Sequence, residues 1–186
     1  PNAEVDACPI SDGGEGFTDA IVSANHHEKR NTLSTGPLGH GLYADWALLM
    51  KEGRADTAVI EMAEASGLCL VDTPYRDPMI TTTYGTGEMI RQAIRSGCKN
   101  IVVGVGGSAT NDGGCGMAQA LGVEFYKKYG QRIRHPITGG ELQSIIGIDV
   151  SKMDTRFKDI SFTVACDVTN PLTGPNGAAH VYGPQK

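Results

Sequence analysis

The sequence predicts an α/β fold with a mainly parallel sheet and flanking helices. Apolar runs that suit strands alternate along the chain with stretches of helical periodicity. The run Ile101–Val105 has no polar break, which is typical of a central strand covered on both faces. With 186 residues, of which 40% are hydrophobic and 20% charged, the chain can bury a core without disulfides.

The first quarter of the chain predicts a strand, a helix and a hairpin. Residues 5–10 form a short apolar stretch, and apolar residues at 17, 20, 21 and 24 follow at helical spacing. Two extended segments within residues 32–49 flank a Gly-Pro-Leu-Gly turn, which predicts an antiparallel hairpin. We place a domain boundary just before it, so that residues 1–33 belong to one α/β domain and residues 34–186 to a second.

Strands and helices alternate in the rest of the chain. A helix led by residues 81–88 carries a stripe of Met89, Ile90, Ala93 and Ile94 and ends at Gly97. A shorter helix is predicted through residues 117–121, and residues 127–160 predict charged turns with one further helix. Strands are predicted over residues 57–63, 101–105, 123–126 and 161–166.

Charge and cysteine content exclude several classes of function. Sixteen Lys and Arg against 21 Asp and Glu give a net charge of −5, so we expect no nucleic-acid partner. No apolar run is long enough to cross a membrane, and we expect a cytoplasmic protein without a membrane partner. The five cysteines form no CxxC pair, which favours reduced thiols over disulfides or zinc: Cys8, Cys69, Cys98, Cys115 and Cys166.

Four predicted strand exits carry small, glycine-rich and acidic residues. In an open parallel sheet, ligands bind on the loops that leave the carboxyl ends of the strands. We therefore expect Asp12, Glu64, Asp112 and Asp167 to converge on one cleft. The exits are residues 12–15, 61–66, 106–114 and 167–170.

The loop at residues 106–114 is the strongest candidate for binding phosphate. Consecutive glycines let several backbone N–H groups converge on an anion, and the following helix adds the positive end of its dipole. A plain helix cap explains residues 81–86 about as well as anion binding does. The candidate ligands of substrate or phosphate are Gly106, Gly107, Ser108, Thr110, Asn111, Gly113, Glu64, Ser66, Thr83, Thr86 and Asn170.

Three acidic residues are candidates for the chemistry itself. Phosphoryl transfer requires positioning and charge neutralisation, and Mg²⁺ needs only one or two carboxylates beside phosphate oxygens and water. Asp112 and Asp167 are candidates for ligating Mg²⁺ or for taking the proton of a hydroxyl group, and Asp12 is a third catalytic candidate. If Asp112 is the base, Asp112→Asn should lower turnover by about 10²–10⁴.

Two other kinds of site remain open at this stage. Residues 104–109 fit the pattern GxGxx[GA] directly after a strand, with Glu124 about 20 residues on, as in NAD-dependent oxidoreductases. A non-catalytic domain that binds a small acid is the third reading. The P-loop pattern fails, because no lysine follows a suitable glycine.

Six segments together resemble the bacterial-type glycerate kinase family (glycerate 2-kinase, type 1). The resemblance covers essentially the whole chain in the right order and implies phosphorylation of D-glycerate by ATP with Mg²⁺, mostly to 2-phosphoglycerate. The segments are SDGGEG (11–16), TGPLG (35–39), VIEMAEASGL (59–68), TTTYGTGE (81–88), VGVGGSATNDGGCGM (103–117) and ACDVTNPLTGPNGAA (165–179).

The resemblance also implies a two-domain kinase whose small-molecule substrates bind in the cleft between the domains. Because family members are longer at both ends, we expect an internal fragment: the first domain is incomplete and the second is truncated at its C-terminus. Whether such a fragment is active alone, and whether the protein is a homodimer, stays open. The loops expected to face the cleft are residues 11–16, 61–66, 81–88, 106–114 and 167–170.

Overall fold

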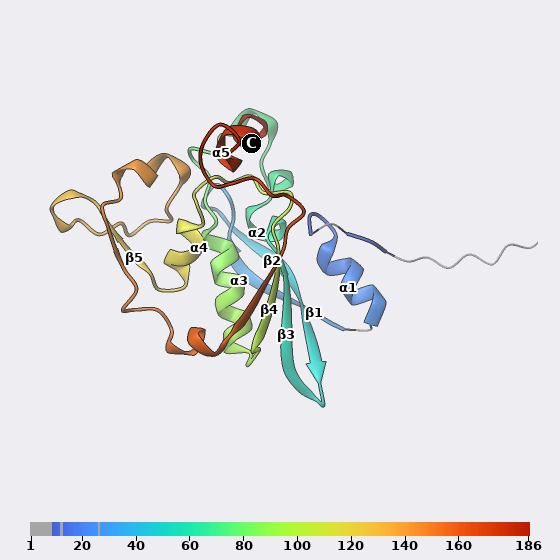
Figure 1. Ribbon diagram of the computed structural model, residues 1–186. Helices are drawn as coiled ribbons and strands as arrows, with labels where there is room; N and C mark the ends of the chain where they lie inside the picture. The colour runs from blue at the N-terminus through green and yellow to red at the C-terminus, as the bar shows by residue number, and fades with distance from the viewer. Residues whose placement is uncertain (1–8, 12, 26) are drawn as a thin grey trace, which may run out of the picture.

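A five-stranded sheet in the order β1-β2-β3-β4-β7 forms the centre of the computed structural model, which describes residues 9–11, 13–25 and 27–186 (Figure 1). β1–β2 and β2–β3 pair antiparallel, whereas β3–β4 and β4–β7 pair parallel. Within this sheet β2 therefore runs against the other four strands, and the expected α/β class with a mainly parallel sheet is confirmed. The strands are β1 (Glu28–Thr35), β2 (Gly41–Lys51), β3 (Arg54–Glu61), β4 (Asn100–Gly104) and β7 (Ser161–Ala165).

The predicted antiparallel hairpin is confirmed as β1 and β2. Its register runs from Glu28 opposite Leu48 to Thr35 opposite Gly41. Ala44, Trp46 and Leu48 alternate into the core, and this burial fixes which face of β2 is turned inward. β1 begins four residues earlier than predicted, because its exposed polar start is held by pairing with β2 and carries no apolar signal.

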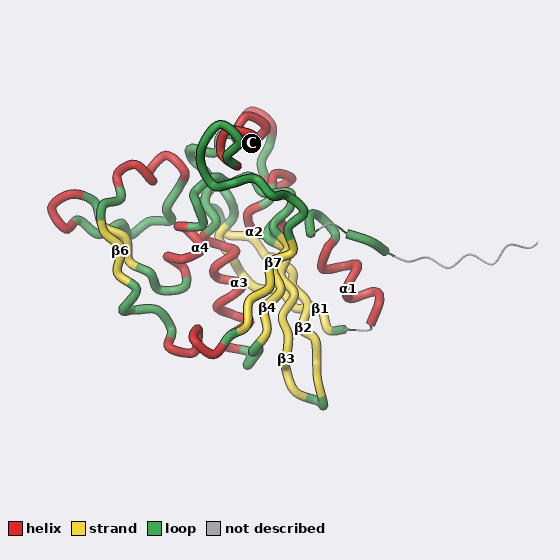
Figure 2. Tube along the Cα trace, viewed as in Figure 1, coloured by secondary structure: helices red, strands yellow, loops and turns green. Residues whose placement is uncertain are grey.

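Helices lie on both sides of the sheet. α1 (Phe17–Asn25) covers one side and α3 (Tyr84–Arg95) covers the other, with α4 (Cys115–Ala120) packed against α3 (Figures 1 and 2). The predicted stripe on α3 is confirmed, because all four of its apolar residues are buried. Gly97 follows the helix with a φ of +94°, the left-handed conformation that commonly ends helices. Two shorter helices are α2 (Ala63–Ser66) and α5 (Ala178–Tyr182).

Residues 123–160 form a lobe beside α4 rather than a continuation of the main sheet. β5 (Glu124–Tyr126) pairs antiparallel with β6 (Gly147–Asp149), above a small core that includes Phe125 and Ile137. The further helix predicted over residues 127–160 is replaced by short 3₁₀ turns, because this segment has no apolar stripe long enough for an α-helix. The 3₁₀ helices of the described chain are η1 (Leu68–Leu70), η2 (Thr73–Tyr75), η3 (Lys128–Gly130), η4 (Gly139–Ser144), η5 (Thr155–Asp159) and η6 (Gly183–Gln185).

Some predictions concern residues that the structure does not describe. The strand expected over residues 5–10 lies mostly among them, and so do Cys8 and Asp12. The four described cysteines are free thiols. No helix in the described part of the chain is long and apolar enough to cross a membrane. The division into domains at residues 33 and 34 stays a prediction.

Candidate functional site

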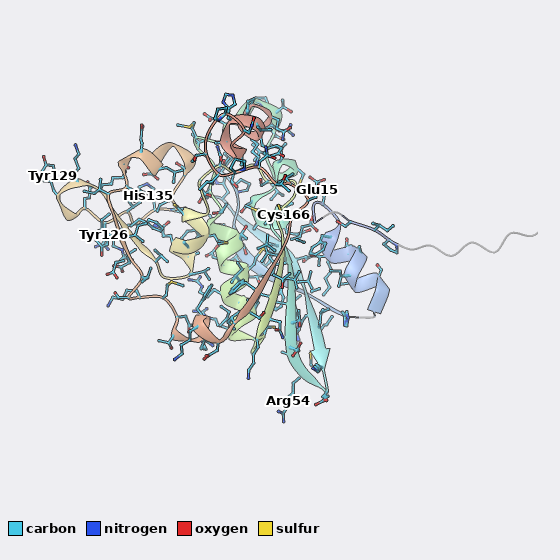
Figure 3. The ribbon with its side chains drawn as sticks, in the orientation of Figure 1. Glu15, Arg54, Tyr126, Tyr129, His135 and Cys166 are labelled. Carbon is cyan, nitrogen blue, oxygen red and sulfur yellow. The ribbon has the colours of Figure 1, made fainter. Side chains whose placement is uncertain are left out.

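A cavity of about 410 Å³ opens where the chain leaves β4 and β7. Because these neighbouring parallel strands are in register from Asn100 opposite Ser161 to Gly104 opposite Ala165, the two exit loops emerge side by side. Glu15, from the loop before α1, and Cys166, which follows β7, meet at this edge of the sheet (Figure 3). We call this space the strand-exit cavity; its lining comes from residues 14–15, 68, 105–108, 166–168, 182 and 185–186.

Close packing of two glycine loops forms one wall of the cavity. The N–H of Gly106 donates to the carbonyl of Gly13 at 3.1 Å. A Cβ atom at Gly106 would lie 2.6 Å from the Cα of Gly14, so only glycine allows this approach. In the described part of the chain, no acceptor receives the main-chain N–H of Gly107 or Ser108. These two N–H groups are therefore available to a bound anion.

Lys186 supplies a positive charge to the same wall. Its ammonium group donates to Ser108 Oγ at 2.5 Å and to the carbonyl of Thr110 at 3.0 Å. Burial lowers the pKa of Lys186, and the charge of Asp112 partly offsets that effect. The sequence does not predict a role for this lysine, because no motif marks it and its partners lie 76 and 78 residues away.

Two exposed carboxylates, Glu15 and Asp167, line the strand-exit cavity. The structure therefore brings Asp167 together with the predicted phosphate ligands Gly106, Gly107 and Ser108. Among the described residues, no group of three or more His, Cys, Asp and Glu side chains could hold a metal ion by itself. One or two carboxylates suffice for Mg²⁺ when a nucleotide supplies phosphate oxygens, so the donor set fits a metal–nucleotide complex.

Asp112 lies in the interior rather than on the cavity wall. Its carboxylate accepts hydrogen bonds from the N–H and hydroxyl groups of Thr83, both at 2.8 Å. It also accepts the N–H groups of Gly114 at 2.9 Å and Gly116 at 3.1 Å. Both carboxylate oxygens thus already have partners, and the side chain is only 1% exposed. Its assignment as a catalytic base or metal ligand stays a prediction.

Several other candidates are buried beneath the cavity instead of lining it. Ser66 and Thr86 hydrogen-bond to each other through their hydroxyl groups at 2.8 Å. Thr83 is held by Asp112, and Thr110 is buried with its carbonyl turned to Lys186. The hydroxyl groups of Ser66, Thr86 and Thr83 hold α3 to its neighbours, and the roles of all four residues as ligands stay predictions.

The remaining candidates lie around the rim or in a neighbouring cavity. Glu64 lines a second space of about 300 Å³ with Glu15 and Glu61, and it accepts the N–H of Asp45 at 3.1 Å. Asn170 accepts the hydroxyl of Tyr182 at 2.7 Å and so fixes α5 beside the strand-exit cavity. Asn111 and Gly113 do not line the strand-exit cavity.

The alternative NAD site finds no support in the geometry. A dinucleotide fold places the next helix directly after the glycine loop and the acidic residue on the next strand of the same sheet. Here α4 begins only at Cys115, and β5 lies in the separate two-stranded sheet. Glu124 is occupied by an ion pair with Arg132 at 2.8 Å and by the hydroxyl of Tyr126.

Comparison with known proteins decides the family. The model of the glycerate kinase family matches residues 1–186. The chain belongs to the glycerate kinase family. It is 50% identical over its full length to glycerate 2-kinase of Escherichia coli K12, covering 48% of that protein. It is 48% identical over its full length to glycerate kinase of Bacillus subtilis 168, covering 47% of that protein.

A solved structure agrees with this membership of the glycerate kinase family. This chain superposes on the crystal structure of a Salmonella typhimurium LT2 protein that is described as a glycerate kinase 2. The TM-score is 0.87 and the sequences are 47% identical. The match covers 96% of this chain and 47% of the other. The chain thus spans about half the length of the glycerate kinases that it matches.

Proposed function

We propose that the full-length chain transfers the γ-phosphoryl group of ATP to D-glycerate. By the full-length chain we mean a chain as long as the relatives that contains residues 1–186. The product would be 2-phosphoglycerate, and Mg²⁺ would accompany the nucleotide. The observation that carries this proposal is the convergence of the β4 and β7 exit loops on the strand-exit cavity. Two N–H groups without an acceptor among the described residues, an ammonium group and two carboxylates lie there. The relatives named glycerate kinase support the substrate.

The residues of this cavity suit phosphoryl transfer, in which positioning and electrostatics do most of the work. The N–H groups of Gly107 and Ser108 would hold phosphate oxygens. Asp167 and Glu15 would hold Mg²⁺, which neutralises phosphate charge when bound. In the alternative role, Asp167 would accept the proton of the attacking hydroxyl group instead of holding Mg²⁺. Asp167 is exposed to the cavity, whereas Asp112 is buried.

The proposal extends to partners and location. The partners would be the small molecules glycerate and ATP, and the protein would work in the cytoplasm. A homodimer is a further proposal.

A coupled assay of ADP release tests the function directly. The full-length chain is assayed with ATP, Mg²⁺ and D-glycerate, with L-glycerate and lactate as control acceptors. We expect release that depends on D-glycerate and stops when EDTA removes Mg²⁺. Phosphorus NMR of the product then separates 2-phosphoglycerate from 3-phosphoglycerate. A full-length chain that folds and releases no ADP with D-glycerate would refute the proposal.

A further inference from the structure

We propose that Lys186 binds a phosphoryl oxygen of the nucleotide, in an anion site that it forms with the main-chain N–H groups of Gly107 and Ser108. The inference rests on the proposed function and deepens it by naming the group that receives the phosphate charge. Sequence motifs give no role to Lys186, and the geometry of its ammonium group carries the assignment.

Lys186 has no ion-pair partner among the described residues, and the charge of Asp112 acts on it only from beyond ion-pair distance. An ammonium group has three N–H bonds, and two of them donate to Ser108 Oγ and the carbonyl of Thr110. Both acceptors are neutral, and no carboxylate of the described residues lies within ion-pair distance of Lys186. A partly buried cation without an ion-pair partner is costly, so a site of this kind favours an anionic ligand.

The surrounding groups favour a phosphoryl group over a carboxylate. A phosphoryl group carries enough oxygens to accept from Lys186 and from two N–H groups while another oxygen binds a metal ion. Glu15 and Asp167, in the same cavity, would repel a lone carboxylate but can hold the metal that bridges to a phosphate. The cavity therefore provides donors and metal-binding acceptors together.

The fold fixes the position of Lys186 through its neighbours. Asn170 accepts the hydroxyl of Tyr182 at 2.7 Å and donates to the carbonyl of Asn176 at 3.0 Å. These bonds tie α5 to the loop that follows β7, and η6 then leads directly to the lysine. Burial lowers the pKa of Lys186, as expected for a partly buried ammonium group without an ion-pair partner.

Binding of inorganic tripolyphosphate tests the site without turnover. Titration calorimetry compares the wild-type full-length chain with Lys186→Met and with Lys128→Met, a matched control at an exposed lysine outside the cavity. We expect affinity to fall by about 10- to 100-fold in K186M, the usual effect of losing a charge-assisted hydrogen bond, and to stay unchanged in K128M. We also expect kcat for ADP release to fall, with little change in the KM for D-glycerate.

A second measurement does not depend on how K186M folds. Lysines of the wild-type chain are reductively methylated with ¹³C, and the resonance absent from Lys186→Arg is assigned to Lys186. We expect its pKa to rise when tripolyphosphate is added, because the anion stabilises the charged form. An unchanged pKa would overturn the assignment.

The outcomes separate this inference from the proposed function. Unchanged tripolyphosphate affinity in a folded K186M chain that still releases ADP overturns the role of Lys186 and leaves the kinase proposal intact. A rise in the KM for D-glycerate alone also overturns it and assigns Lys186 to the substrate carboxylate. Tripolyphosphate binding that depends on Lys186, in a chain that does not phosphorylate glycerate, supports the site and refutes the kinase proposal.

Discussion

At the scale of single residues, Asp112 joins two helices through one carboxylate. Thr83 immediately precedes α3, and Gly114 and Gly116 lie at the start of α4. Asp112 accepts four hydrogen bonds from these three residues in the interior. A hydrogen bond to a charged group contributes about 1.5–3 kcal/mol, so this side chain is well placed to determine how the two helix starts are held together.

Replacing Asp112 by Asn should therefore lower stability. The amide offers one oxygen in place of two and turns its own N–H₂ group toward backbone donors, so we expect the free energy of unfolding to fall by about 2–4 kcal/mol. Urea unfolding of D112N measures this, and Asp167→Asn is the matched control at an exposed carboxylate. If D112N unfolds like the wild type but loses turnover by about 10²–10⁴, Asp112 is the base that the sequence suggested.

We expect the free energy of unfolding to depend on pH through the carboxyl group of Glu61. Burial raises its pKa above the ordinary value of 4.5, and the N–H groups of Thr18 and Gly16 oppose that rise. The folded state therefore binds the proton more tightly than the unfolded state, and the contribution of Glu61 to stability falls as pH rises above 4.5 through the raised pKa. Urea unfolding of wild type and Glu61→Gln between pH 4.5 and 7 isolates this contribution. A wild-type minus E61Q difference that stays flat or grows with pH would contradict it.

At the scale of elements, the packing of two loops shapes the strand-exit cavity. A Cβ atom at Gly106 would lie 2.6 Å from the Cα and 2.8 Å from the N of Gly14, and neither backbone atom can move freely. We expect Gly106→Ala to push the loops apart, lowering the free energy of unfolding by about 1–3 kcal/mol and weakening tripolyphosphate binding. Gly41→Ala is the control, because its nearest neighbour is Leu33 Cδ1 at 3.8 Å. Equal stability of G106A and G41A would rule out this tight packing.

The sequence predicted elements better than it predicted contacts between them. The stripe on α3 and the alternation in β2 are local patterns, and burial follows them directly. The pairing of β5 with β6 could not be read this way, because a three-residue strand carries too little pattern to show its partner. Glycine-rich exits likewise marked the region of the cavity, but not that Asp112 turns inward while Lys186 reaches the loop from the far end of the chain.

At the scale of the whole molecule, β7 leaves one edge of the sheet open. In the described structure it pairs only with β4, and its side chains Phe162 and Val164 are 39% and 58% exposed. An exposed strand edge that also carries apolar side chains is a template for association with another chain. Because the chain spans about half the length of its relatives, we expect association through this edge above all when residues 1–186 are produced alone.

We therefore expect residues 1–186, produced alone, to self-associate through β7. Val164→Lys should shift the chain toward monomer, because lysines on two paired edges would repel each other and lose apolar contact. Analytical ultracentrifugation over a range of concentrations measures this shift, with Val150→Lys as the matched control at a valine that is 61% exposed in the lobe of β5 and β6. If V150K shifts the equilibrium as much as V164K does, association depends on exposed apolar surface in general and not on the edge of β7. A wild-type chain that stays monomeric at every concentration would show that the side chains of β7 already protect this edge.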